Sequence, residues 1–248
     1  MTALVVNVLG AQPSAQTAAP GITMRLRIEE LGGGRVHAAV LRCQTCINPR
    51  GRRYTKDEQS RLYELFGEPS QWDRTLAPVT WAQSSLVVPS FERRIDVDLP
   101  LACTYDLEVA SAKYFHAIRD GDVPLVVLFS GTIFARSAAQ VAEASAALSI
   151  EPVPWSLEAS YRMPADVWRA AMDQFFPGGG WIRLQRETID RLQAFRGRHV
   201  VVTWDEAIDL LFCEAGQAGT AGRASTAGEA GRAGAAGRDA VSLAGERA

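Results

Sequence analysis

Residues 99–135, LPLACTYDLEVASAKYFHAIRDGDVPLVVLFSGTIFA, guide the interpretation of the whole chain. Two long apolar runs flank the polar group Arg119–Asp122, and Asp-Gly is a strong turn signal between strand-like segments. The pattern predicts a β-hairpin. The second run, Val123–Ala135, is apolar at nearly every position, which is typical of a strand covered on both faces. We therefore expect this hairpin at the centre of the fold.

Further strands are predicted outward from this hairpin. Apolar and polar residues alternate over Thr23–Ile28, Val36–Ile47 and Arg94–Leu99, the period of a half-buried strand. The N-terminal segment 1–12 and a short segment at Leu148–Val153 also favour strands. Apolar faces of this kind need a second layer to cover them, so the sequence predicts a mainly antiparallel β-sandwich.

Helices are predicted after residue 50 and again in the C-terminal third. Thr55–Glu58 and Thr203–Glu206 each have the spacing of a capping box. Pro164 precedes an apolar stripe of helical period, and Arg186–Arg196 carries another, formed by Ile189, Leu192 and Phe195. The fold class expected is α+β: the sandwich with a C-terminal group of helices.

The expected domain organisation is one α+β domain over residues 1–213. Its sandwich covers about residues 1–155 and its helical part about residues 156–213; whether the helical part is a separate domain stays open. Residues 214–248 are rich in Gly and Ala and contain no aromatic residue. Such a segment buries too little apolar surface to offset its ordering entropy, so we expect a disordered tail.

Composition narrows the classes of protein. The 248 residues are 47% hydrophobic with a formal net charge of −2, which gives no basic field for nucleic acid. No apolar run approaches the ~20 residues of a membrane span, and the N-terminus lacks the basic region of a signal peptide. We therefore expect a cytoplasmic protein that binds neither nucleic acid nor membrane.

Motifs for catalysis are sparse. Cys43 and Cys46 form a CxxC pair, but the pair falls within a predicted strand, where this spacing directs the thiols to opposite faces. A zinc site would need a second such pair, which the chain lacks. His37, His116 and His199 lie far apart along the chain. We expect no catalytic residue, no resident metal and no cofactor.

Residues suited to contact with another molecule are aromatic or polar and lie near predicted loops. Tryptophan is enriched at the energetically dominant positions of protein interfaces. A Lys-Tyr-His group precedes the predicted central turn and would lie at one rim of the sandwich. The candidates for binding are Trp72, Trp81, Lys113, Tyr114 and His116.

Five segments carry a resemblance to a known family: MRLRIEE, AAVLRCQ, LFGEPSQWDRTLAPVTW, the stretch from VDLPLACTYDLEV to LFSGTIF, and the stretch from EASYRMPADVW to ETIDRLQAF. Together they cover most of residues 4–213. The chain resembles an uncharacterised bacterial, actinobacterial family of unknown function that is associated with [NiFe]-hydrogenase gene clusters. That family has no assigned activity. The resemblance implies a function that is connected with [NiFe]-hydrogenase.

A second similarity concerns architecture. From Leu107 onward, the predicted order of two paired strands, a buried strand and a helix opening with Pro164 is similar to the layout of SecB-type export chaperones. It covers about a third of the chain. It implies a protein that holds another polypeptide.

Three functions follow as expectations. The first is a non-enzymatic accessory protein that binds another protein, a hydrogenase subunit or maturation factor. The second is an enzyme that binds a small molecule or metal at a site built from distant segments, namely Cys43, Cys103, His116 and Asp106 or Glu108. The third is an oligomeric structural subunit that pairs through an edge of the sandwich.

Overall fold

The computed structural model describes residues 2–15, 18–104, 106, 109–136, 139, 141, 147–179 and 182–216. The chain divides into two compact units, Met1–Ile182 and Arg183–Ala248. The boundary lies inside the stretch 156–213 that the sequence assigned to a single helical part. The helix that follows Pro164 is thus in the first unit, and the two helices after residue 185 form the second.

The first unit contains a three-stranded antiparallel sheet, called here the front sheet. Its strand order is β1 (Leu4–Pro13), β2 (Gly21–Glu30) and β5 (Arg94–Ala102). The central strand β2 alternates as predicted, with Ile22, Met24, Leu26 and Ile28 all buried. The inward face of β2 is therefore apolar from Ile22 to Ile28.

The second sheet, called here the back sheet, has five antiparallel strands. Its path is β4 (Val79–Val88), β3 (Arg35–Ile47), β6 (Asp122–Arg136) and β7 (Ser149–Pro152). The strand β8 (Glu158–Pro164) pairs with the first half of β6, and β7 pairs with its second half. The long strand β6 therefore organises this sheet.

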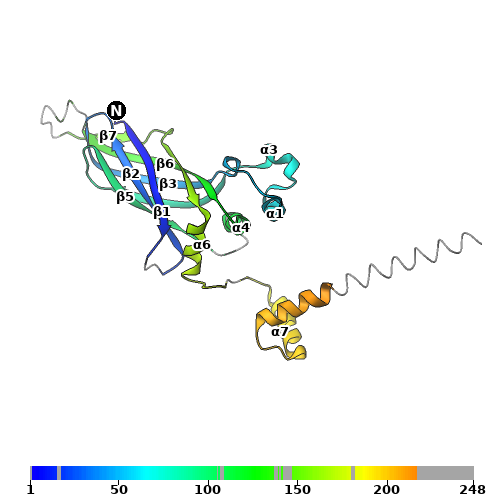
Figure 1. Ribbon diagram of the computed structural model, residues 1–248. Helices are drawn as coiled ribbons and strands as arrows, with labels where there is room; N and C mark the ends of the chain where they lie inside the picture. The colour runs from blue at the N-terminus through cyan, green and yellow to red at the C-terminus, as the bar shows by residue number, and fades with distance from the viewer. Residues whose placement is uncertain are drawn as a thin grey trace, which may run out of the picture. The chain divides into compact units, whose positions relative to one another are not determined.

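The two sheets share one core. Buried residues of both belong to a single hydrophobic cluster, and strands approach each other at both edges, β1 beside β8 and β4 beside β5. The predicted antiparallel β-sandwich within an α+β fold is confirmed (Figure 1).

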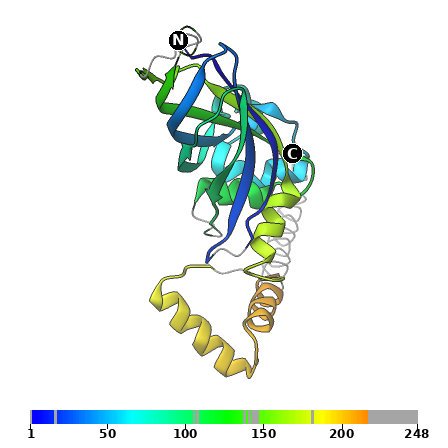
Figure 2. The ribbon, with the colours of Figure 1, turned by 90° about the vertical axis from the view of Figure 1, so that its left-hand side faces the viewer.

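Short helices follow β3 and gather at one end of the sandwich. The chain runs through η1 (Pro49–Gly51), α1 (Lys56–Arg61), α2 (Tyr63–Phe66), η2 (Pro69–Gln71) and α3 (Trp72–Thr75). The predicted capping box at Thr55 and Glu58 is present. Figures 1 and 2 show that these helices and α4 (Ala110–Ala117) lie away from the end of the sheets at which the N-terminus of the chain is marked.

The predicted central hairpin is wrong in its first half. Residues 110–117 form helix α4 rather than a strand, and its buried residues Ser111, Tyr114 and Phe115 recur at helical spacing. The Asp-Gly turn signal is correct, since Gly121 has φ of 77°, but the turn joins a helix to β6. The first of the two paired strands expected from the similarity to SecB-type chaperones is therefore a helix in this structure.

The strand β6 was expected to be buried on both faces, and this is true only near its beginning. Val123, Pro124 and Leu125 are all buried, because η1 lies against this part of β6. From Val127 onward the strand alternates between buried and more exposed side chains. The apolar residues of the outer face, such as Leu128, are therefore left partly exposed to solvent.

The last helix of the first unit is α6 (Ala165–Asp173). Trp168, Ala171 and Met172 form its buried stripe, and it packs against β1 and β2. The helix begins directly after Pro164, as predicted.

The second unit contains α7 (Arg186–His199) and a helix over residues 204–216. The helix α7 extends beyond the predicted end at Gly197 and stops at Val200, whose φ is 55°. Of its predicted apolar stripe, only Phe195 is buried. The second capping box is confirmed, because Thr203 N and Glu206 N each bond the other residue's side chain.

The disordered tail was expected over residues 214–248, but the last helix runs through residue 216. The rest of that prediction, residues 217–248, lies outside the described residues.

Candidate functional site

Helix α4 brings together three of the five residues predicted to bind a partner. Tyr114 is fully buried, and its hydroxyl lies 2.8 Å from the hydroxyl of Tyr54. Tyr54 donates its own hydrogen to the carbonyl oxygen of Pro49 at 2.6 Å, so Tyr114 is the donor to Tyr54. Burial raises the pKa of both phenols above their ordinary value, which keeps the pair neutral.

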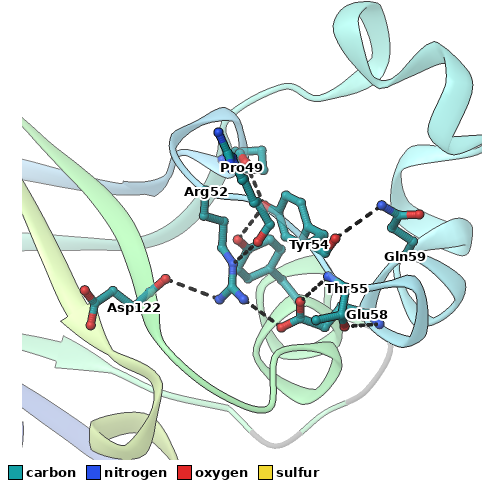
Figure 3. Close-up of polar contacts among 9 residues, drawn as sticks. Pro49, Arg52, Tyr54, Thr55, Glu58, Gln59 and Asp122 are labelled. Atoms are coloured by element: carbon teal, nitrogen blue, oxygen red, sulfur yellow. Dashed lines mark hydrogen bonds and ion pairs between the residues drawn. The ribbon is translucent and has the colours of Figure 1, made fainter.

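An ion pair between Arg52 and Glu58 lies beside the two tyrosines (Figure 3). Nη2 of Arg52 donates to Oε1 of Glu58 at 2.7 Å, and Nη1 donates to the carbonyl oxygen of Asp122 at 3.2 Å. The two side chains are only 11% and 6% exposed. The guanidinium carbon also lies 5.2 Å from the ring centre of Tyr54. The pair therefore ties the segment before α1 to the start of β6.

Aromatic rings connect these residues to the rest of the first unit. Trp72 packs edge-on against Tyr54 at 5.2 Å between ring centroids and donates its indole N–H to Gly67 O at 3.0 Å. Phe115 of α4 contacts Trp81 of β4 at 4.8 Å and stacks on Trp168 of α6 at 5.2 Å. The rings thus join α3, α4, β4 and α6.

The remaining candidates lie on the same helix. The ring of His116 meets Trp168 edge-on at 4.9 Å, and burial lowers the pKa of this imidazole. Lys113 forms an ion pair with Glu64 of α2. The structure therefore brings all five predicted residues around α4, but Trp72 and Tyr114 are buried. Their contacts serve packing between the helices and the sandwich.

The structure describes four of the five residues that the sequence suggested for a metal or small-molecule site: Cys43, Cys103, Asp106 and His116. Cys43 is fully buried in β3, and burial raises the pKa of its thiol to about 11 and that of Cys103 to about 12. Both thiols are therefore poor nucleophiles near neutral pH. Asp106 N bonds Thr104 Oγ1, and Glu108 lies outside the described residues. Among the described residues, no three His, Cys, Asp or Glu side chains are grouped to hold a metal.

Cys43 and Cys46 are both free thiols in β3. Cys43 belongs to the hydrophobic core, whereas the Sγ of Cys46 lies 3.5 Å from Nε2 of Gln44. Gln44 is an immediate neighbour of Cys43 along the strand, so its side chain lies on the opposite face. The predicted separation of the two thiols is consistent with these contacts.

Arginines line a shallow concavity of about 490 Å³ beside the ion pair. Arg50 donates to the carbonyl oxygens of Leu76 and Asp73, and Arg162 donates to that of Gly51 at 2.8 Å. These side chains hold the loop after β3 against its neighbours.

An apolar surface that the sequence did not indicate covers part of the back sheet's outer face. Val40 pairs with Val87 on one side and Thr132 on the other, and Thr132 pairs with Pro152. In the next row Phe134 pairs with Ile150. Val40, Val87 and Ile150 are 47%, 69% and 69% exposed. We call these six residues the outer-face patch.

The patch continues toward an exposed tryptophan. Trp155, three residues beyond Pro152, is 95% exposed in the turn between β7 and β8. The sequence signal for the patch is an apolar residue where alternation calls for a polar one: Val40 lies between Ala39 and Leu41, which are both buried. The pairing of Val40 with Val87 and with Thr132 is non-local, so the sequence alone does not reveal the patch.

Comparisons with known proteins identify a family for this chain but assign it no activity. Among curated proteins none matches the chain. Two solved structures of a β-glucosidase from Kluyveromyces marxianus, one selenomethionine-labelled and one with glucose, match at 8% and 7% identity with TM-scores of 0.24 and 0.22. Each match covers 65% of this chain and 15% of the enzyme. Values this low assign neither a fold nor an activity to this chain.

Among the described residues, no helix is long and apolar enough to cross a membrane. A family model described as "Family of unknown function (DUF6084)" matches residues 1–220. The chain therefore belongs to this family of unknown function.

Proposed function

We propose that this chain is a non-enzymatic accessory protein that binds another protein through the outer-face patch. The observation that carries the proposal is the group of exposed aliphatic side chains Val87, Val40 and Ile150, which lie on β4, β3 and β7 in two neighbouring rows of one sheet. Soluble proteins rarely expose contiguous apolar surface of this kind unless it serves an interaction.

The shape of the patch favours a macromolecular partner. Pairing across four strands makes it an extended sheet face, whereas small molecules bind in concave pockets that enclose most of their surface. Trp155 beside the patch supplies a large exposed aromatic side chain, the type most often responsible for interface affinity. A folded domain or a long apolar segment of another protein fits these features.

The partner that we propose is a subunit or maturation factor of a [NiFe]-hydrogenase. This part of the proposal rests on the resemblance to a family associated with hydrogenase gene clusters. A cytoplasmic location belongs to the same proposal, because assembly of that kind takes place where the partner is made.

The test is affinity purification of the tagged full chain from its native host, with mass spectrometry of the proteins that accompany it. The variant Ile150→Asp places a charge within the patch, and Tyr63→Asp is the matched control, since Tyr63 is exposed on α2. We expect a hydrogenase subunit or maturation factor with the wild type and the control, and its loss with Ile150→Asp. Retention of that partner by a folded Ile150→Asp protein would contradict the proposed surface.

Turnover of a substrate by the purified chain without any partner would contradict the non-enzymatic role. A protein that emerges from its host with no partner in stoichiometric amount would contradict the accessory role.

A further inference from the structure

The second unit carries an interaction surface of its own. Its two helices touch through few side chains: the guanidinium carbon of Arg196 lies 4.2 Å from the ring centre of Trp204, and Nε2 of His199 lies 3.7 Å from Oε1 of Glu214. Between residues 186 and 216 only Phe195 and Ala207 are buried. A helix pair with so small a core gains little stability from its own packing.

Large apolar side chains remain exposed along the last helix. Trp204, Ile208 and Phe212 are spaced four residues apart, so they share one side of the helix. Phe212 is 71% exposed, Trp204 is 40% exposed beside Arg196 of its own chain, and Ile208 is 37% exposed. An apolar stripe of this length on a soluble helix is stabilised only when another surface covers it.

A groove between the two helices offers such a surface. Its volume is about 920 Å³, and its apolar lining comes from Leu192, Phe195 and Leu211. Arg191 and Arg198 of α7 also line it, together with His199 and with Glu214 of the last helix. The groove therefore combines apolar side chains with two guanidinium groups on its α7 side and one carboxylate on the other side.

The charges of the two helices are opposite. The helix over residues 204–216 carries Asp205, Glu206, Asp209 and Glu214 and contains no Lys or Arg. Helix α7 has four arginines against two carboxylates. An acidic helix with an apolar stripe is thus complementary to the α7 side of the groove, where Arg191 and Arg198 lie.

We propose that two copies of this chain associate through their second units, each laying the stripe Trp204–Ile208–Phe212 into the groove of the other. The occupant is a second copy because the chain itself carries the acidic apolar helix that the groove fits. A two-fold arrangement repeats the same contact twice, and the contact is of the helix-in-groove kind. The proposal does not depend on the outer-face patch.

The first test is the mass of the full-length protein in solution, measured by light scattering and sedimentation across the micromolar range. The wild type is expected to dimerise more weakly as salt rises. Phe212→Asp should raise the dimer dissociation constant at least about tenfold. Ile150→Asp is the matched control on the first unit and should dimerise like the wild type.

A charge exchange separates this contact from other effects of substitution. One chain carries Asp205→Lys with Asp209→Lys, and another carries Arg191→Glu with Arg198→Glu. Among the described residues none of these four side chains forms an ion pair, so the folded chain loses none. Each variant alone should be monomeric, and their mixture should form a heterodimer.

A wild type that stays monomeric throughout that range would overturn the proposal, because the stripe would then be covered by something else. A dimer that survives Phe212→Asp would also overturn it and would point to an edge of the sandwich. Failure of the charge-exchanged mixture to form a heterodimer would exclude the groove as the site of contact.

Discussion

Glu58 shows how one buried carboxylate holds three segments together. Its Oε2 accepts the backbone N–H of Thr55 and so caps α1, while its Oε1 accepts from Arg52. Arg52 in turn reaches the backbone of Asp122 at the start of β6. The helical end of the sandwich is therefore fixed by this one polar network.

Glu58→Gln should destabilise the protein by roughly 3–5 kcal/mol, because the guanidinium of Arg52 would stay buried without a counter-charge. The free energy of unfolding in urea measures this. Asp57→Asn is the control: Asp57 pairs with Arg61 on the exposed side of the same helix, where loss of a pair costs at most about 0.5 kcal/mol. Equal effects of the two substitutions would show that the buried pair adds nothing beyond a surface pair.

His116 should make stability depend on pH. Burial lowers its pKa below the ordinary value of 6.5, so the unfolded chain takes up the proton first as pH falls. The free energy of unfolding should therefore decrease as the pH drops through 6.5 toward the folded pKa. His116→Gln should flatten this decrease. An unchanged slope in His116→Gln would contradict the burial of this imidazole.

At the scale of elements, the spacing of apolar residues predicted strands and helices correctly where local contacts determine them. It failed where contacts between distant segments of the chain determine them. The alternating strands β2, β3 and β5 and the capped helices follow from spacing alone. Helix α4 was missed because its apolar residues adjoin β6, and a short run such as Ala110–Ala117 satisfies both a strand and a helix. Burial of Tyr114 and Phe115 against the rings of Tyr54, Phe66 of α2, Trp81 of β4 and Trp168 of α6 selects the helix.

The same limit applies to the candidate site. The sequence grouped Lys113, Tyr114 and His116, which are neighbours along the chain, and indicated Trp72 and Trp81 only as separate binding candidates. It did not find the pairing of Arg52 with Glu58, or the outer-face patch. The patch depends on strand register between residues that are distant in sequence, such as Val40 with Val87 and with Thr132. Register is a tertiary property that one strand's pattern does not contain.

Strand β6 permits a direct test of which face is covered. Phe129 is buried, and Leu128 next to it is 40% exposed. Phe129→Ala should cost roughly 3–5 kcal/mol, whereas Leu128→Ala should cost less than about 1 kcal/mol because its site is partly solvated. Denaturant unfolding compares the two. A large loss for Leu128→Ala would mean that the outer face is covered, and a small loss for Phe129→Ala would remove β6 from the core.

At the scale of the whole molecule, the two units carry different surfaces. The first unit has a core that both sheets share and a flat apolar patch on the back sheet. The second has an acidic apolar helix and a groove lined by arginines. Ile150→Asp is expected to abolish partner binding and leave the dimer, and Phe212→Asp is expected to do the reverse. Loss of both properties in either variant would show that the two surfaces act as one.

The central claim is that the outer face of the back sheet contacts another protein. The most direct measurement is photo-cross-linking in the native host, with a photoreactive amino acid at position 150 in one strain and at position 63 in another. We expect a discrete cross-linked product from position 150, identified by mass spectrometry as a hydrogenase subunit or maturation factor, and none from position 63. The absence of any product from position 150, or the same product from both positions, would contradict it.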